Sequence, residues 1–311
     1  MTRVVFAGPD GRWAQYESPL RAALADAGID ARLDCDASHP QDVDFLVFAP
    51  NGPVDDFTPF SRLKAVLNLW AGVEGIVDNP TLHVPLTRMV DTGLTEGMVE
   101  WCVGHTLRHH LGMDAQIAQQ DGIWRHVEYI PPLARTRKVC VLGLGALGSA
   151  VCRALCALNF EVSGFSRRPK DIPGVSCFSG PDMLKALDTA EIVIALFPYT
   201  PATDSILGAD AFAAMAKGAV ILNPGRGGLI DDNALLAALD SGQIGHATLD
   251  VFRAEPLPAG HIFWSHPKVT VTPHIASETR PETAARVIVE NIRRGLAGEP
   301  YLHLVDKKSG Y

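Results

Sequence analysis

Short apolar runs alternate with longer stretches of mixed character along most of the chain. The runs are rich in Val, Leu, Ile and Phe, and several stop at Gly or Pro, as buried strands do. We predict strands over residues 3–8, 44–49, 65–70, 138–142, 161–165, 191–197, 219–222 and 246–251. We predict helices over residues 19–27, 94–111, 114–120, 146–158 and 280–296. Strands that alternate with helices imply crossover connections and parallel sheets, so the pattern predicts an α/β fold.

Capping residues mark the ends of two of these helices. Thr95 is predicted to cap the 94–111 helix at its N-terminus. The segment Thr279-Arg280-Pro281-Glu282 has the spacing of a capping box with proline in the first turn, and Gly298 follows as a stop. The last helix carries an apolar stripe at helical spacing, which consists of Ala284, Ile288, Ile292 and Leu296. We expect this stripe to return the chain to its first domain.

A glycine-rich turn separates the strand at 138–142 from the helix at 146–158. Gly143, Gly145 and Gly148 have the G-x-G-x-x-G spacing, in which the glycines allow a tight turn, a close pyrophosphate and close helix packing. The free N–H groups and the positive end of the new helix attract phosphate. We therefore predict a dinucleotide site whose phosphate-binding residues are Gly143, Gly145, Ala146 and Leu147.

The next strand ends at Ser166-Arg167-Arg168, beyond the glycine turn. An NAD site usually has Asp or Glu at this point for the ribose 2′-hydroxyl, whereas a hydroxyl and two guanidinium groups suit a 2′-phosphate. The sequence thus favours NADP, with NAD as a possible second cofactor. The alternative is that Arg167 and Arg168 form a solvated basic turn.

Length and charge limit the other classes of function. A chain of 311 residues predicts two domains, and 47% hydrophobic with 20% charged residues is typical of globular proteins. The net charge of −8 gives no general attraction to nucleic acid or to an anionic membrane. There is no long apolar run, and the first residues read as a strand rather than a signal peptide, so we expect a cytoplasmic protein.

The cysteines and histidines do not form a recognisable metal-binding motif. The six cysteines lie in apolar contexts without a C-x-x-C pair, so we expect buried thiols rather than disulfides or a zinc site. Cys152 and Cys156 are expected to pack their helix on its sheet. His105 and His109 share a helix face, but no third ligand accompanies them in the sequence, so we expect no metal.

Three later segments place polar groups where strands end. Arg226 lies among glycines after one strand, Glu255 follows Asp250 after the next, and His274 lies in Thr272-Pro273-His274. Taken singly, Arg226 also suits a loop cation, Glu255 a surface acid and His274 a buried core imidazole. An earlier turn, Ala71-Gly72-Val73-Glu74-Gly75, follows the strand at 65–70 and suits either a ligand-binding turn or a plain connection.

Together these motifs resemble the D-isomer-specific 2-hydroxyacid dehydrogenases. The likeness extends from about residue 65 to the end. The motifs that carry it are Ala71-Gly72-Val73, the glycine turn, Ser166-Arg167, Pro198 with Thr200-Pro201, Asn223 to Gly227, Leu249 to Pro256, Thr272-Pro273-His274, Val305-Asp306 and Gly310-Tyr311. The resemblance implies two Rossmann-like domains with parallel sheets. A nucleotide domain, 98–282, would be inserted into a split substrate domain, 1–97 plus 283–311, and the two would close over a cleft.

The resemblance also implies the role of each residue. Arg226 would bind the carboxylate and carbonyl of the substrate, His274 would donate a proton, and Glu255 would assist the imidazole. The remaining cofactor contacts would come from Pro198, Thr200 and Asp250, and the substrate contacts from Trp70, Ala71, Gly72 and Val73. The implied activity is NADPH-dependent reduction of small 2-oxo acids, with glyoxylate and hydroxypyruvate favoured.

Chemistry supports this division, since a carbonyl that gains a hydride needs a cation and a proton donor. Trp70 and Glu74 depart from the family pattern, which leaves a reductase of a bulkier 2-oxo acid as an alternative. A silent NAD(P)-sensing protein is a second alternative, although a sensor needs no catalytic trio. The resemblance further implies a homodimer, and we expect Met98, Trp101 and Leu107 to be buried against the second subunit.

Overall fold

The computed structural model describes residues 1–126, 128 and 130–311. The described chain divides into two compact units, of which the first consists of Met1–Leu94 with Glu278–Tyr311 and the second of Thr95–Ser277. The boundaries expected from the sequence fall at 97/98 and 282/283. The substrate and nucleotide roles of the two units remain predictions. No described helix is long and apolar enough to cross a bilayer.

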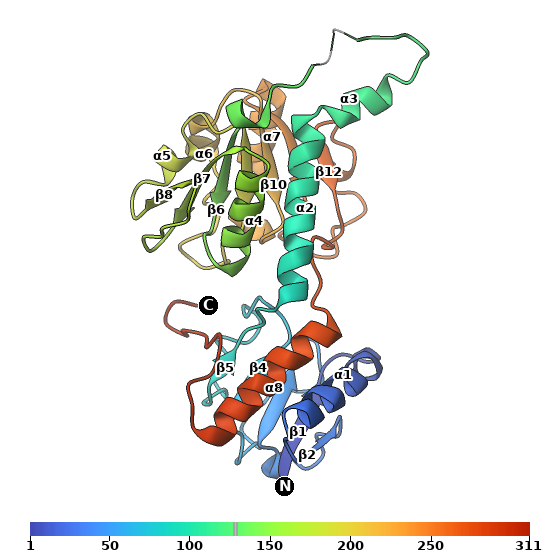
Figure 1. The fold of residues 1–311 in the computed structure, drawn as a ribbon, viewed down its shortest axis with the longest axis vertical. Helices are drawn as coiled ribbons and strands as arrows, with labels where there is room; N and C mark the ends of the chain where they lie inside the picture. Colours follow the sequence, from blue (N-terminus) through green and yellow to red (C-terminus); the bar gives the residue numbers. More distant parts are fainter. Residues whose placement is uncertain (127, 129) are drawn as a thin grey trace. The chain divides into compact units, whose positions relative to one another are not determined.

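The first unit is a parallel five-stranded sheet covered by helices on one face and by loops on the other. The strand order is β2 (Ala31–Asp34), β1 (Thr2–Ala7), β3 (Phe45–Phe48), β4 (Ala65–Asn68) and β5 (Leu86–Thr87). Figure 1 shows α1 (Arg12–Asp26) and α8 (Pro281–Ala297) side by side on this sheet, and η1 (Pro40–Asp42) is a short turn in a loop. The last helix thus returns to the first unit, as the sequence predicts.

The apolar stripe of α8 explains this return. Ala284, Ile288 and Ile292 are almost completely buried and belong to one core cluster with Phe45 and Leu67 of the sheet. Burial of an Ile side chain contributes roughly 1.5–3 kcal/mol, so the stripe stabilises the unit strongly. Leu296, the fourth residue of the predicted stripe, is exposed instead because it lies in the last turn of the helix.

Several predicted helix ends are wrong. The first helix begins at Arg12 rather than at 19 and contains Pro19, because burial of Tyr16 and Leu20 outweighs the lost N–H donor. Thr279 does not cap α8, since its hydroxyl donates to the carbonyl of Leu69 at 2.9 Å. Gly298 does end α8 in the left-handed conformation.

The second unit is a parallel seven-stranded sheet with helices on both faces. The strand order is β12 (Val269–Val271), β11 (Ile244–Leu249), β10 (Ala219–Asn223), β9 (Ile192–Ala195), β6 (Lys138–Leu142), β7 (Glu161–Ser166) and β8 (Val175–Ser179). One core cluster holds α2 (Thr92–His110) and α4 (Ala146–Ala157), and another holds α5 (Met183–Leu187), α6 (Ala209–Ala214) and α7 (Asp232–Ser241). The short elements are α3 (Met113–Ala118), η2 (Ala134–Thr136), η3 (Gly227–Leu229) and η4 (Ile262–Trp264). The predicted α/β class with parallel sheets is confirmed.

Helix α2 differs from its prediction at its start and in its packing. It begins at Thr92, and the carboxylate of Asp91 accepts from the N–H groups of Gly93 and Leu94, so Thr95 is not the cap. Met98 belongs to the core of the second unit, and Trp101 and Leu107 pack against that core. Met98 is thus buried within its own unit, while Trp101 and Leu107 remain partly exposed, and their burial against a second subunit stays a prediction.

A cluster of polar side chains, here called the histidine seam, joins α2 to β11 and β12. His109 Nε2 lies 2.9 Å from Thr248 Oγ1, and His246 Nε2 lies 2.9 Å from Thr270 Oγ1, both in hydrogen bonds. Arg108 donates to the same Thr270 hydroxyl at 3.0 Å. Burial lowers the pKa of His109 to about 3 and the pKa of His246 to about 4, so both rings are neutral near pH 7.

All six cysteines are free thiols. Cys152 is buried in the α4 core and Cys156 is half-buried, which agrees with the packing role expected for them. Cys35 is exposed, however, so the expectation of buried thiols fails there. It lies directly after β2, the outer strand of its sheet.

Candidate active site

The glycine turn lies at the point where the strand order of the second sheet reverses. Gly143 has a φ of 108°, and a side chain there would clash with the carbonyl of Leu196 after β9. A Cβ at Gly148 would lie 1.8 Å from the oxygen of Gly143, so only glycine permits this approach of helix and strand. A Cβ at Gly145 would meet only open space, and no side chain caps α4. The turn therefore offers an open helix N-terminus, which fits a dinucleotide pyrophosphate.

The residues at the end of β7 fit a phosphorylated ribose. The Ser166 hydroxyl donates to the carbonyl of Arg168 at 2.7 Å, which shapes the turn after the strand. Arg167 and Arg168 are both exposed. Since β7 is the direct neighbour of β6, this turn lies beside the glycine turn at the same sheet edge.

The turn after β9 is held by its own hydroxyl groups. Thr203 Oγ1 donates to the carbonyl of Pro198 at 2.7 Å and accepts from the N–H of Thr200 at 2.8 Å. Because β9 is the other neighbour of β6, Pro198 and Thr200 belong to the same edge as the glycine turn.

The proposed catalytic trio follows three adjacent strands. Arg226 comes after β10, Glu255 after β11 and His274 after β12, and these strands are neighbours in the order β12, β11, β10. Parallel strands end at one edge, so the sheet gathers residues far apart in sequence. The structure thus places the trio and the glycine turn at one edge of one sheet.

His274 and Glu255 form a direct pair. The Nδ1 atom of His274 lies 2.6 Å from Oε2 of Glu255, and the second carboxylate oxygen of Glu255 accepts from the N–H of Phe252 at 2.8 Å. The side chains are 53% and 34% exposed, so a substrate can reach the ring. A carboxylate at Nδ1 fixes the tautomer and leaves Nε2 for the substrate.

Asp250 holds the backbone of the histidine segment. Its carboxylate is completely buried and accepts from Thr272 Oγ1 at 2.5 Å and from the N–H groups of Ile275 and Ala276 at 2.9 Å each. Its carbonyl accepts from the N–H of His274 at 2.8 Å. His274 has a φ of 54°, a conformation that non-glycine residues rarely adopt, and these bonds maintain it. Asp250 thus anchors the segment that carries His274, and the cofactor contact expected of it stays a prediction.

Arg226 lies half-buried in a loop that is shaped by Asn223. The Asn223 amide donates to the carbonyl of Arg226 at 3.0 Å, and its oxygen accepts from the N–H of Gly225 at 3.2 Å. The Arg226 guanidinium donates to the carbonyl of Gly225 at 2.6 Å. Asn223 is completely buried, so the loop has a defined shape that orients the guanidinium.

The turn expected to bind substrate in the first unit is organised by Asn68. The buried Asn68 amide donates to the carbonyls of Trp70 and Gly72 at 2.9 Å each. Within the described residues, the N–H groups of Gly72 and Val73 have no acceptor in the chain. Two adjacent free N–H groups suit an anion. The Trp70 side chain is partly exposed.

A glycine turn at a topological switch point, with a polar trio at the carboxyl edge, defines a dinucleotide-binding α/β protein. Residues 102–276 match the family model described as "D-isomer specific 2-hydroxyacid dehydrogenase, NAD binding domain". The chain belongs to this family. It is 38% identical to a glyoxylate/hydroxypyruvate reductase A of Yersinia enterocolitica over 99% of both chains.

Two solved structures are similar over the whole chain. A D-isomer-specific 2-hydroxyacid dehydrogenase from Xanthobacter autotrophicus Py2, in complex with NADPH and MES, has a TM-score of 0.91 and 40% identity, and the match covers 100% of this chain and 99% of that one. An NADPH-dependent glyoxylate/hydroxypyruvate reductase from Sinorhizobium meliloti, in complex with NADP and sulfate, has a TM-score of 0.86 and 33% identity, with 100% of both chains covered.

Sequence reasoning missed three residues that shape these loops. Asn68, Asn223 and Arg253 have side chains that bond to backbone groups near the proposed site residues. The two asparagines end apolar strands, where a polar residue is a usable signal. Arg253 gave no such signal, because its partners are distant in sequence.

Proposed function

We propose that this protein reduces small 2-oxo acids to 2-hydroxy acids with NADPH, with glyoxylate and hydroxypyruvate as favoured substrates. The observation that carries the proposal is the pair of His274 and Glu255, held at the sheet edge that also bears Arg226 and the glycine turn. The reductases from Yersinia and Sinorhizobium named above support the choice of substrates.

The geometry suggests how the three residues divide the reaction. NADPH, when bound, supplies the hydride that the carbonyl carbon accepts. Negative charge then develops on the carbonyl oxygen, and His274 donates a proton to it from Nε2. Glu255 at Nδ1 stabilises the imidazolium before the transfer. The guanidinium of Arg226 binds the carboxylate in a forked geometry and polarises the carbonyl.

NADPH binding is supported by the fit of the second unit. Gly143, Gly145 and the first turn of α4, with Ala146 and Leu147, would hold the pyrophosphate. Arg167 and Arg168 would bind the 2′-phosphate, while Pro198 and Thr200 would border the cofactor. The NADPH and NADP complexes of the two similar structures agree with this choice.

The turn of the first unit would complete recognition of the substrate. We propose that the N–H groups of Gly72 and Val73 bind the carboxylate, and that Ala71 and Trp70 contact the substrate side chain. Support comes from the two N–H groups that lack an acceptor among the described residues.

Loss of NADPH absorbance after addition of glyoxylate tests the function. Wild type should oxidise NADPH, whereas His274→Ala should lose about 10²–10⁴-fold in turnover, as expected for a general acid. The NADPH dissociation constant should be nearly unchanged in this variant, because His274 faces the substrate. A wild-type protein that binds NADPH but reduces no 2-oxo acid would favour a sensor instead.

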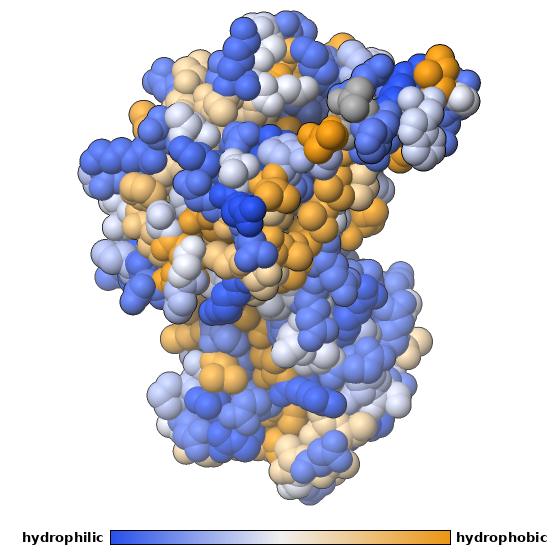
Figure 2. Space-filling view, turned by 45° about the horizontal axis from the view of Figure 1, so that its top comes forward, coloured by the Kyte–Doolittle hydropathy of each residue, from blue (hydrophilic) through white to orange (hydrophobic). Residues whose placement is uncertain are grey.

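The proposal includes a homodimer. Beyond α3, the chain exposes large apolar side chains that a partner could cover, and Figure 2 shows hydrophobic colour on the segment beside the grey atoms. The large apolar side chains exposed in this part of the chain are those of Ile123, Trp124, Ile130 and Leu133, with Trp124 90% exposed. Several exposed apolar side chains in one short segment are typical of protein–protein interfaces. Light scattering should give a dimer mass for wild type and a smaller mass for Trp124→Ser with Ile130→Glu.

The proposal also includes a cytoplasmic location. The free thiols support it, because secreted proteins more often carry disulfides. Cell fractionation with a marker enzyme for each compartment would test it.

A further inference from the structure

We propose that Arg253 is a positioning residue that fixes the Arg226 loop and the Glu255 loop relative to each other. The inference rests on the proposed function, since it concerns the geometry of the same catalytic groups. No motif or chemical role in the reaction singles out Arg253. Its assignment comes from the contacts of its side chain alone.

The guanidinium of Arg253 connects its own loop to two others. It donates to the carbonyl of Ile230 from Nε at 3.2 Å and from Nη2 at 2.7 Å, and to the carbonyl of Gly228 at 3.1 Å. It also donates to Ser205 Oγ at 2.7 Å and to Asp204 Oδ1 at 3.0 Å. We call these five residues the arginine clamp. The side chain remains 37% exposed, so this many bonds marks a specific arrangement rather than a chance surface ion pair.

The clamped loops also touch through their backbones. A Cβ at Gly227 would lie 1.9 Å from the carbonyl carbon of Phe252, so the two loops meet without an intervening side chain. A Cβ at Gly228 would lie 2.3 Å from the ring of Tyr199, whose hydroxyl donates to Asp204. Close backbone contacts transmit a shift of one loop to the next.

The clamp therefore affects the positions of both Arg226 and Glu255. The carbonyls of Gly228 and Ile230 lie in the segment directly after Arg226, so the clamp fixes where that guanidinium points. On the other loop, Arg253 follows Phe252, whose N–H holds the Glu255 carboxylate on His274. Loss of the clamp should loosen Arg226 and separate Glu255 from His274.

Lysine cannot replace this arginine. An ammonium on a flexible stem retains attraction to Asp204, but it lacks the planar fork that reaches two carbonyls and a hydroxyl together. The kcat/KM of Arg253→Lys should therefore be closer to that of Arg253→Ala than to that of wild type.

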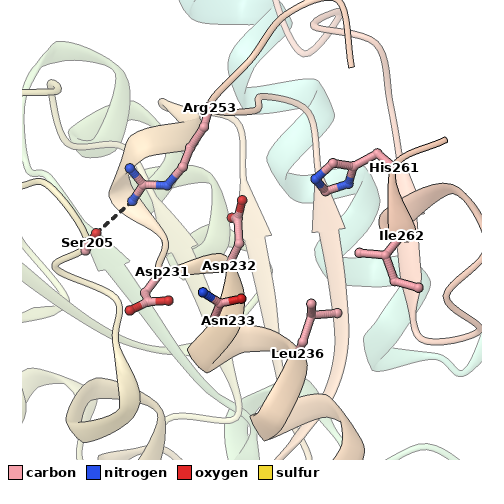
Figure 3. A pocket seen from close by; sticks show the side chains of 8 residues that line it. All are labelled: Ser205, Asp231, Asp232, Asn233, Leu236, Arg253, His261 and Ile262. Carbon is pink, nitrogen blue, oxygen red and sulfur yellow. Dashed lines mark hydrogen bonds between the residues drawn. The ribbon is translucent and has the colours of Figure 1, made fainter. Parts of the chain in front are cut away.

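A cavity beside the clamp makes chemical rescue feasible. It has a volume of about 450 Å³, and Figure 3 shows Arg253 and Ser205 on its wall. The other lining residues are Asp231, Asp232, Asn233, Leu236, His261 and Ile262. The carboxylates on this wall attract cations, so added guanidinium can enter the space that Arg253→Ala vacates.

The test compares Arg253→Ala with Arg137→Ala in glyoxylate reduction. Arg137 is a matched control, because it forms an ion pair with Glu191 at 2.8 Å in the same unit but at the amino end of β6. Arg253→Ala should lose about 10- to 100-fold in kcat/KM, a range that corresponds to one or two strong hydrogen bonds. Its rate should also begin to fall at a lower pH than in wild type, and millimolar guanidinium should restore part of the activity.

Two results would overturn the inference. One is an Arg253→Ala enzyme whose kcat/KM and pH profile match those of Arg137→Ala. The other is hydrogen exchange in peptides covering 199–208 and 226–232 that is equal in Arg253→Ala and wild type, since the clamp should protect the amides of Ser205 and Leu207. The exchange measurement needs no turnover. It therefore distinguishes an error in the clamp inference from an error in the proposed function. A wild-type protein that reduces no 2-oxo acid would indicate an error in the proposed function.

Discussion

The histidine seam predicts that mild acid destabilises the second unit. In the folded protein, burial lowers the pKa of His109 to about 3 and that of His246 to about 4, whereas a histidine in an unfolded chain titrates near 6.5. Below about pH 6.5 the unfolded chain binds more protons, so the free energy of unfolding falls as pH falls. The free energy of unfolding continues to fall until the pH reaches the pKa of each histidine in the folded protein.

The size of the effect follows from the pH interval between the unfolded histidine pKa, near 6.5, and the lower pKa values of the folded protein. Each histidine contributes about 1.4 kcal/mol per pH unit, so a drop to about pH 5 costs roughly 2 kcal/mol per ring and about 4 kcal/mol for the pair. Domains are typically stable by about 5–15 kcal/mol, so this loss is large. Arg108, beside both rings, further disfavours their protonation, while Asp114 favours it.

Urea denaturation at two pH values measures the effect. We expect the two rings to account for about 4 kcal/mol of the unfolding free energy that wild type loses between about pH 7.5 and pH 5, so the double variant His109→Gln with His246→Gln should lose less by about that amount. Glutamine keeps a hydrogen-bonding group for the two threonines but cannot be protonated. The exposed His126, changed to Gln, serves as the control and should leave the pH dependence as in wild type. Equal losses in wild type and double variant would refute the role of the seam.

Three further predictions concern the proposed site. In Glu255→Gln, the rate of glyoxylate reduction should begin to fall at a lower pH, because the imidazolium of His274 loses its carboxylate; superimposable pH profiles would count against this pairing. Arg226→Lys should raise the KM for the 2-oxo acid and lower turnover, since an ammonium lacks the fork, and unchanged steady-state kinetics would exclude that contact. Arg167→Ala should weaken use of NADPH by roughly 10- to 100-fold with little change for NADH, and equal losses for both cofactors would contradict the 2′-phosphate assignment.

The sequence predicted features that depend on local order. Strand, glycine turn and helix around Gly143 need only neighbouring residues, and the structure has them in place. The gathering of Arg226, Glu255 and His274 at one sheet edge could also be expected, because parallel strands end on the same side.

Features that depend on contacts across the fold could not be predicted. Thr279 has the spacing of a helix cap, yet its hydroxyl reaches the carbonyl of Leu69, which is distant in sequence. The resemblance assigns Asp250 to the cofactor, but its bonds to Thr272 and Ala276 could not be read from the sequence, because only the folded chain brings these residues to its carboxylate. Short strands such as β2 and β8 were not predicted for the same reason, since pairing with a neighbour defines them more than their own sequence.

The return of α8 to the first sheet has a consequence for synthesis on the ribosome. Residues 1–94 leave the ribosome first, but Phe45 and Leu67 of their sheet are covered by residues of α8, which is made after the whole second unit. The second unit is continuous in the chain and can fold as soon as Ser277 has emerged. Until then, α1 can cover its part of this sheet face, but the part that α8 covers stays exposed. The part of the protein that is translated first should therefore be the part that folds last.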